Sequence, residues 1–154
     1  MQYKTKSPEE TVRFGEKIAK LLKSGDIVAF EGELGAGKTC LIKGIASGLG
    51  ITDKITSSSF VLMRPFNAKF PVYHFDLYRL CDKEELIDIG YEEFIFSDGV
   101  SLIEWAEKMG DWIGNSYLLI KIEYDDDNAE WRNIYLEGCG ERYENFINEL
   151  DDKL

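Results

Sequence analysis

The stretch GELGAGKT at residues 32–39 constrains the fold more than any other part of this sequence. It fits the pattern G-x-x-x-x-G-K-[ST], whose glycines let the backbone curl until successive N–H groups point inward at the phosphates of a nucleotide. Such a loop follows a buried strand and opens a helix, whose positive end adds to the field at the phosphates. The apolar run IVAF at residues 27–30 precedes the loop, and the segment KTCLIKGIASGLG at residues 38–50, which is typical of a helix, follows it. We therefore expect a strand, a phosphate-binding loop and a helix, in that order.

The N-terminal segment carries a strong helix start. Ser7 supplies a side-chain oxygen for the N-cap, Pro8 suits the first helical position, and Glu10 completes a capping box. Apolar side chains then recur at helical spacing, which predicts a helix with one face packed on a core. We expect this helix to end at Gly25.

The remaining segments alternate between strand and helix patterns. Apolar runs predict strands that end at Asp76 and Glu104, and residues 82–96 predict helical segments broken at Gly90. Two later segments alternate apolar with polar side chains, which predicts a half-exposed antiparallel hairpin at a sheet edge. The other expected elements are a polar loop leading into a strand (55–66), a short helix and turn (106–116), the two hairpin strands (117–125 and 132–138) and a closing amphipathic helix (143–150).

Helices interleaved with strands, with apolar strands early and alternating strands late, predict an α/β fold. The specific expectation is a three-layer P-loop NTPase-like sandwich around a mixed parallel and antiparallel sheet. The chain has 154 residues, and we expect residues 1–154 to form a single P-loop domain.

The charge of the chain is unevenly distributed. Residues 1–81 hold 12 Lys and Arg against 8 Asp and Glu, whereas residues 82–154 hold 6 against 21 and bring the formal net charge to -11. Strong direct binding to nucleic acid is therefore not expected, because Lys and Arg neutralise the phosphates in such complexes. The acidic half is either the counterpart of a basic partner surface or a solvated face that keeps the protein in solution.

No targeting or membrane segment is predicted. The sequence contains no run of about 18 apolar residues, and its charged N-terminal segment lacks the apolar core of a signal peptide. Three widely spaced cysteines without a CxxC pair, beside a single histidine, predict reduced thiols rather than a zinc site or disulfides. We therefore expect a cytoplasmic protein that does not bind a membrane.

The loop motif assigns roles to its own residues. Lys38 is expected to reach the β- and γ-phosphates, and Thr39 to place its hydroxyl on Mg²⁺. Cys40 stands just inside the helix, so its backbone N–H can contact the α-phosphate while its sulfur packs. Because no N-K-x-D segment is present to recognise guanine, we expect adenine as the base and ATP as the nucleotide. The predicted nucleotide contacts are Glu33, Leu34, Gly35, Ala36, Gly37, Lys38, Thr39, Cys40 and Trp105.

Two carboxylates stand where predicted strands end. Ligands of open α/β sheets bind beyond the carboxyl ends of the strands, and Asp76 and Glu104 occupy such places. They are candidates for holding Mg²⁺ and for activating the attacking water. His74 lies two residues before Asp76, on the same strand face, and is expected to be a buried, hydrogen-bonded residue rather than a catalytic one. Trp105 either lines an adenine pocket or packs in the core.

Together these motifs resemble one known family. GELGAGKT, TSSSF, YHFDLYRL, an EEL…IG segment and LIEW occur in the order and at the spacings of TsaE, formerly YjeE or YdiB, over about residues 7–137. The resemblance implies an ATPase that assists bacterial synthesis of the threonylcarbamoyladenosine (t6A) group in tRNA. It also implies partners, because TsaE acts on a complex of the proteins TsaB and TsaD, which hold the tRNA. Its ATP hydrolysis drives or resets that complex.

The resemblance also implies roles for single residues. Thr39 and Glu104 would be the Mg²⁺ ligands, and Trp105 would lie near the nucleotide. Asp76 would be needed for hydrolysis, together with Lys38.

A further part of the resemblance concerns a switch loop. Ser57, Ser59 and Phe60 match a segment usually written S-P-T-F, which lies near the γ-phosphate. Ser58 replaces the proline of that segment, a substitution that makes the loop less stiff.

Two other functions remain open at this point. A small-molecule kinase on the same fold would pass the γ-phosphate to an acceptor, although such enzymes usually carry a lid with several arginines and only Arg64 and Arg79 stand near suitable loops. A nucleotide-gated binding module would bind ATP without turning it over. The role of Asp76 is open as well, since it can orient or deprotonate the attacking water or contact Mg²⁺ through a water.

Overall fold

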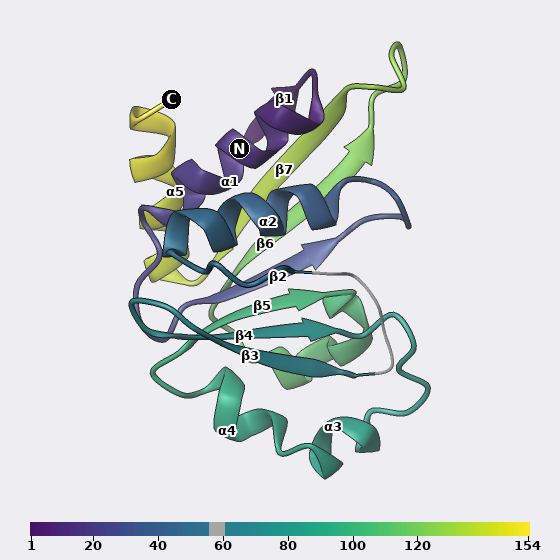
Figure 1. The fold of residues 1–154 in the computed structure, drawn as a ribbon, viewed down its shortest axis with the longest axis vertical. Helices are drawn as coiled ribbons and strands as arrows, with labels where there is room; N and C mark the ends of the chain where they lie inside the picture. Colours follow the sequence, from purple (N-terminus) through teal and green to yellow (C-terminus); the bar gives the residue numbers. More distant parts are fainter. Residues whose placement is uncertain (56–60) are drawn as a thin grey trace.

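Seven strands form one mixed sheet in the computed structural model, which describes residues 1–55 and 61–154 (Figure 1). The strands are β1 (Gln2–Thr5), β2 (Ile27–Glu31), β3 (Met63–Asn67), β4 (Pro71–Asp76), β5 (Val100–Glu104), β6 (Tyr117–Tyr124) and β7 (Arg132–Cys139). They lie in the order β1-β7-β6-β2-β5-β4-β3. The four central strands, β6, β2, β5 and β4, are parallel to one another. The outer strands pair antiparallel: β7 with β6, β1 with β7, and β3 with β4.

Helices cover both faces of this sheet. They are α1 (Pro8–Ala19), α2 (Lys38–Leu49), α3 (Glu84–Asp88), α4 (Tyr91–Ile95), the 3₁₀ helix η1 (Ala106–Ile113) and α5 (Glu141–Asp152). Figure 1 shows α2 in front of the sheet, with α3 and α4 near β3 and β4. None of the helices in the described part of the chain is long and apolar enough to span a bilayer. The helix layers and the mixed sheet confirm the predicted α/β sandwich.

The alternation of side chains along β2 explains the layers. Val28 and Phe30 point into the core formed with α1, α2 and α5. Ile27 and Ala29 point into a second core, formed with α3, α4 and η1. All four side chains are buried, because helices cover both faces of the strand. The continuous apolar run at residues 27–30 therefore correctly predicted a strand that is covered on both sides.

Helix α1 begins where its sequence predicted. Ser7 Oγ accepts a hydrogen bond from the backbone N–H of Glu10 at 3.2 Å, and Glu10 Oε2 accepts one from the N–H of Lys6 at 2.8 Å. The returning contact of this capping box thus reaches one residue further back than the N-cap residue itself. The predicted end at Gly25 is wrong. The helix ends at Ala19, because the chain then tightens into turns whose N–H groups bond to carbonyls three residues earlier.

One strand is absent from the sequence prediction. β1 pairs with β7 and forms one edge of the sheet, so the hairpin of β6 and β7 does not lie at the edge, as its alternating pattern suggested. The hairpin itself is confirmed, with Ile122 opposite Ile134. The four residues of β1 are too few to show a period, and their partner strand lies at the other end of the chain. The break between α3 and α4 is also confirmed, at Gly90, whose φ is 69°.

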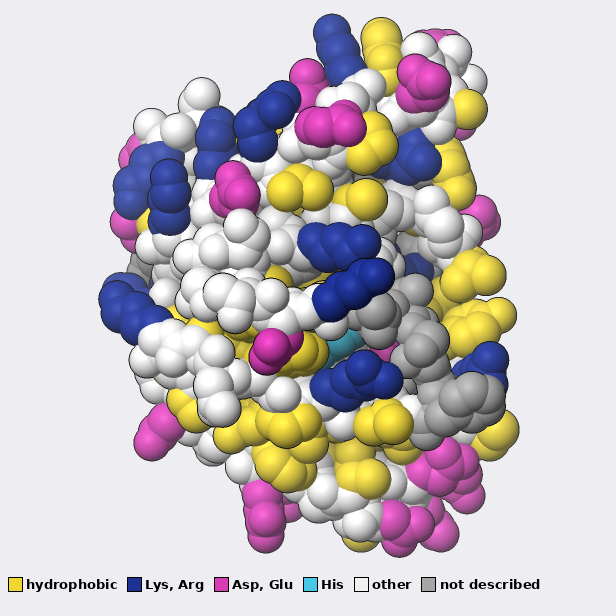
Figure 2. Space-filling model, viewed as in Figure 1, with side chains coloured by type: hydrophobic (Ala, Val, Ile, Leu, Met, Phe, Trp, Pro, Cys, Tyr) yellow, Lys and Arg dark blue, Asp and Glu magenta, His cyan; other side chains and the backbone are white. Residues whose placement is uncertain are grey.

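The uneven charge of the sequence is visible on the surface. Figure 2 shows Lys and Arg side chains gathered over the face that carries α1 and α2, and Asp and Glu side chains over the end with α3 and α4. These two short helices have Glu84, Glu85, Glu92 and Glu93 in their first turns. Carboxylates are stabilising there, because they face the positive ends of the helix dipoles.

Candidate nucleotide-binding site

The loop between β2 and α2 adopts a shape that favours glycine. Gly35 and Gly37 have φ angles of 81° and 109°, in the left-handed region that other residues rarely adopt. A Cβ atom at Gly32 would lie 2.6 Å from the carbonyl oxygen of Ile122 on β6. The backbone therefore curls tightly against the neighbouring strand. Helix α2 begins without a side chain that caps its first N–H groups, which leaves them available to an anion.

Lys38 lies across the loop to which it belongs. Its Nζ donates hydrogen bonds to the carbonyl oxygens of Gly32 and Glu33, the second at 3.1 Å. The same atom lies 4.0 Å from the centre of the Trp105 ring. Burial lowers the pKa of Lys38, although the carboxylates around the site oppose this effect. A buried ammonium group that carbonyls and a ring solvate is well placed to receive a phosphate.

One cavity of ≈ 270 Å³ opens beside the loop and gathers most of the predicted site. Thr39 from α2, Asp76 from β4 and Glu104 from β5 all line it. Two predicted contacts, Glu33 and Ala36, line a neighbouring cavity on β6 instead. The other residues that line the first cavity are Leu34, Gly35, Gly37, Lys38, Cys40, Tyr78 and Trp105.

Asp76 and Glu104 stand opposite each other on adjacent parallel strands, each at the carboxyl end. Burial raises the pKa of Asp76, and nearby Glu104 adds to the rise. The N–H of Tyr78, which donates to Asp76 Oδ1 at 3.1 Å, partly offsets it. A carboxylate with a raised proton affinity is better suited than an ordinary aspartate to take a proton from water.

Glu104 is held by His74. His74 Nε2 and Glu104 Oε2 are 2.8 Å apart, and the two side chains are 4% and 5% exposed. The prediction that His74 is buried and hydrogen-bonded is confirmed. The described residues supply no hydrogen bond to Oε1, the second oxygen of Glu104, and Glu104 is one of the residues that line the cavity.

Trp105 has a φ of 58°, the one positive value among the described residues that are not glycine. Its ring lines the cavity, lies 5.1 Å from the Tyr78 ring and also borders the second core. The two roles that the sequence left open, lining a pocket and packing, are therefore compatible. A backbone held in this sparsely populated region costs about 1–3 kcal/mol, and such residues cluster at functional sites.

Two residues at the site have no role in the sequence prediction. Tyr78 lines the cavity and belongs to the HFDLYRL motif, which is the signal that could have drawn attention to it. Arg132, at the start of β7, donates from Nε to the carbonyl oxygen of Ala36 at 2.8 Å, and its guanidinium lies 4.3 Å from the Tyr124 ring centre. Its contact joins residues 96 positions apart in the chain, and no local pattern signals such a contact.

The side chains present fit a magnesium ion. Thr39, which carries a hydroxyl, and Glu104, which carries a carboxylate, line the same cavity, and Mg²⁺ in nucleotide sites takes one or two carboxylates beside waters and phosphates. The described residues hold no larger cluster of metal-binding side chains. The predicted switch residues Ser57, Ser59 and Phe60 lie outside the described residues, so their role stays a prediction.

Comparison with known proteins points to one family. The family model described as "Threonylcarbamoyl adenosine biosynthesis protein TsaE" matches residues 5–134. A protein from Bacillus subtilis, named tRNA threonylcarbamoyladenosine biosynthesis protein TsaE, is 38% identical over 151 residues, which are 97% of this chain and 93% of that protein. A protein of the same name from Treponema pallidum is 41% identical over 109 residues, which are 71% of this chain and 81% of that protein.

A solved structure agrees with these sequence matches. The crystal structure of YdiB from Bacillus subtilis is similar with a TM-score of 0.81 at 33% identity, and the match covers 99% of this chain and 95% of that chain. The family match includes the loop and both strands that carry the acidic residues Asp76 and Glu104. This chain therefore belongs to the TsaE family.

Proposed function

We propose that this protein binds and hydrolyses ATP with Mg²⁺ as the ATPase subunit of tRNA t6A modification. One observation carries the proposal: Lys38, Thr39, Asp76 and Glu104, which come from α2, β4 and β5, line one cavity beside a loop of phosphate-binding shape. The pathway is inferred from the relatives, which are named tRNA threonylcarbamoyladenosine biosynthesis proteins.

The loop supplies the phosphate contacts in this proposal. The backbone N–H groups of residues 33–37, and those of Thr39 and Cys40, bind phosphate oxygens, while the sulfur of Cys40 packs. When the nucleotide binds, Lys38 gives up its hydrogen bonds to the loop carbonyls and donates to the β- and γ-phosphate oxygens instead. Its side chain needs to move only a short way, because Nζ already lies over the loop. Trp105, next to Lys38 at the cavity, offers its ring to the nucleotide.

Three side chains carry the chemistry. Thr39 and Glu104 would hold the metal ion, and bound Mg²⁺ would offset the charge that develops on the phosphates. Asp76 orients or deprotonates the attacking water, a role that its raised pKa suits. A contact from Asp76 to the metal through a water is compatible with the same position.

The proposed partners are TsaB and TsaD, which hold the tRNA while this chain supplies the nucleotide-driven step that drives or resets their complex. A formal net charge of -11 disfavours strong direct binding of this chain to tRNA. Because tRNA is modified in the cytoplasm, the proposal also locates the protein there. In this proposal residues 1–154 act as a single domain.

Following γ-labelled ATP in the presence of Mg²⁺ tests the proposed activity. We expect slow release of free phosphate by the isolated protein and faster release with TsaB and TsaD. Asp76→Ala should still bind ATP but lose turnover by a factor of about 100 or more. Asp88→Ala, a matched change at an exposed carboxylate on α3, should behave like the unaltered protein. Loss of ATP binding with unchanged turnover per bound ATP would contradict the role of Asp76.

The same labelled ATP separates the proposed function from the alternatives. Label that appears in a small metabolite instead of free phosphate would indicate a kinase. In a reconstituted mixture with TsaB, TsaD and tRNA, the unaltered protein should support many rounds of t6A formation. If Asp76→Ala supports equally many rounds, the protein is a binding module that does not need turnover.

A further inference from the structure

We propose that His74 is a positioning residue, which holds one oxygen of Glu104 so that the other faces the metal site of the nucleotide cavity. The inference rests on the proposed function, because it explains how that site keeps a metal ligand in place. Neither the sequence motif that contains His74 nor the burial of its side chain by itself assigns this positioning role to it.

The geometry of the contact is set by the sheet. His74 pairs in register with Leu102 on β5. Glu104 lies two residues after Leu102, on the same face of β5. The imidazole therefore reaches diagonally across two hydrogen-bonded parallel strands to Glu104 Oε2, at 2.8 Å. Both residues belong to strands inside the sheet, where backbone hydrogen bonds fix their separation.

The chemistry of the pair gives each oxygen of Glu104 a separate task. A carboxylate that binds a metal is ionised and can only accept hydrogen bonds, so in the metal-bound site His74 Nε2 would donate to Oε2. This bond fixes the rotation of the carboxylate group. Oε1 receives no hydrogen bond from the described residues, and Glu104 lines the cavity together with Thr39. In this inference the fixed rotation keeps Oε1 turned toward the cavity that Thr39 also lines.

Stability alone does not account for this pair. Val72 and Leu102, neighbours of His74 on the same sheet face, are apolar and fully buried. A buried carboxylate with its hydrogen-bond partner generally stabilises a protein no more than apolar residues of similar size would. The hydrogen bonds that orient metal ligands, in contrast, commonly raise metal affinity by about 10- to 100-fold.

Nucleotide affinity measured with and without metal tests the inference. The dissociation constant of a non-hydrolysable ATP analogue, adenylyl imidodiphosphate, is measured by calorimetry in excess Mg²⁺ and in EDTA. The affinity gain due to Mg²⁺ should fall about tenfold in His74→Leu, while the affinity in EDTA stays within about twofold. His74→Gln, whose amide nitrogen can donate from nearly the same position, should restore most of the gain.

Two further variants separate positioning from packing. Phe75→Leu removes volume from the opposite, buried face of β4 without touching Glu104, and should leave the gain unchanged. Glu104→Gln should abolish most of the gain, and adding His74→Leu to it should cause no further loss. The thermal unfolding of every variant is recorded, and His74→Gln and Glu104→Gln keep the test valid if His74→Leu does not fold.

The possible results lead to different conclusions. Any one of three results overturns this inference but not the proposed function. They are an unchanged gain in His74→Leu, an equal loss of gain in Phe75→Leu, and a loss in His74→Gln as large as that in Glu104→Gln. If the unaltered protein binds no nucleotide in either buffer, the proposed function is overturned, and this inference with it.

Discussion

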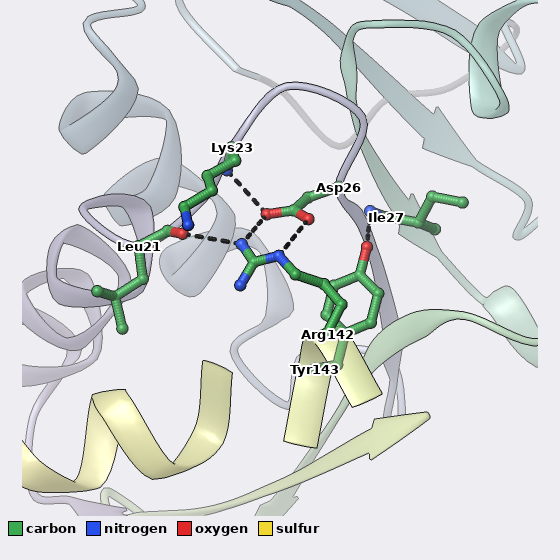
Figure 3. Close-up of polar contacts among 6 residues, drawn as sticks. All are labelled: Leu21, Lys23, Asp26, Ile27, Arg142 and Tyr143. Atoms are coloured by element: carbon green, nitrogen blue, oxygen red, sulfur yellow. Dashed lines mark hydrogen bonds and ion pairs between the residues drawn. The ribbon is translucent and has the colours of Figure 1, made fainter. Parts of the chain in front are cut away.

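The guanidinium of Arg142 on α5 forms two hydrogen bonds with the carboxylate of Asp26, from Nη2 at 2.7 Å and from Nε at 3.2 Å (Figure 3). The guanidinium also donates to the carbonyl oxygen of Leu21 at 3.1 Å. Tyr143, the next residue of α5, accepts a hydrogen bond from the N–H of Ile27 at 2.7 Å. These contacts attach the last helix to the start of β2, the strand that carries the phosphate-binding loop at its other end.

Breaking this attachment should destabilise the fold. Arg142→Met leaves the carboxylate of Asp26, which is 4% exposed, without its cationic partner, so the free energy of unfolding should fall by about 2–4 kcal/mol. Urea denaturation measures the change. Lys153→Met is the control, because it breaks the exposed pair with Glu149 and should change stability by less than about 0.5 kcal/mol. Similar small effects in both variants would show that the Asp26 contact does not stabilise the protein.

Stability at high pH should depend on Tyr143. Burial raises the pKa of this hydroxyl to about 12, and Asp26 adds to the rise while the Ile27 N–H opposes it. In the unfolded chain the hydroxyl ionises near pH 10, so the unfolded state loses its proton first. The contribution of Tyr143 is therefore complete below pH 10, and between about pH 10 and 12 it should fall by up to about 1.4 kcal/mol per pH unit.

Tyr143→Phe isolates this contribution. The variant should lose about 1–3 kcal/mol at pH 7, because the Ile27 N–H is left without its acceptor. Its free energy of unfolding should then fall less steeply above pH 10 than that of the unaltered protein. Urea denaturation at a series of pH values from 8 to about 11 compares the two proteins, and equal slopes would contradict the prediction.

The close approach of α1 and α2 should depend on Gly44. A Cβ atom added there would lie 2.1 Å from the carbonyl oxygen of Val12 on α1. Alanine is a better helix former than glycine by about 1 kcal/mol, but overpacking should reverse this effect and lower the stability by about 1–3 kcal/mol. Lys43→Ala, at an exposed position of the same helix, should stay within about 0.5 kcal/mol. Thermal unfolding measures the stability of both variants. A Gly44→Ala variant more stable than the unaltered protein would contradict the prediction and would mean that the two helices can move apart at little cost.

The shape of the loop should depend on Arg132. Arg132→Leu removes the hydrogen bond to the Ala36 carbonyl and the contact with the Tyr124 ring. If these contacts hold the loop in its binding shape, nucleotide affinity should fall about tenfold, the equivalent of about 1.4 kcal/mol. Titration with a fluorescent ADP analogue measures the affinity. Arg13→Leu, at an exposed position of α1, serves as the control, and equal affinities in both variants would contradict the prediction.

Much of the site could be predicted because its parts are local. The glycines of residues 32–39 encode the loop through their own φ angles, and the apolar runs before Asp76 and Glu104 encode buried strands that end at those residues. The capping box at Ser7 likewise marks a helix start within four residues. In each case the signal and the structure that it predicts lie in the same short segment.

The contacts that complete the site belong to distant segments. Arg132 reaches Ala36, and His74 contacts Glu104, only because strand order and register bring the ends of β4 and β5 and the hairpin of β6 and β7 to the same end of the sheet. A shift of one residue in the pairing of β4 with β5 would turn His74 to the face of the sheet opposite Glu104.

The sequence by itself determined the class of fold, the phosphate-binding loop and the two acidic strand ends, because glycine conformations and side-chain periods are properties of short segments. Only the tertiary structure decided that Lys38, Thr39, Asp76 and Glu104 share one cavity, that β1 and not the hairpin forms the edge, and that His74 contacts Glu104. These features depend on packing and register summed over the whole sheet, which no single segment encodes.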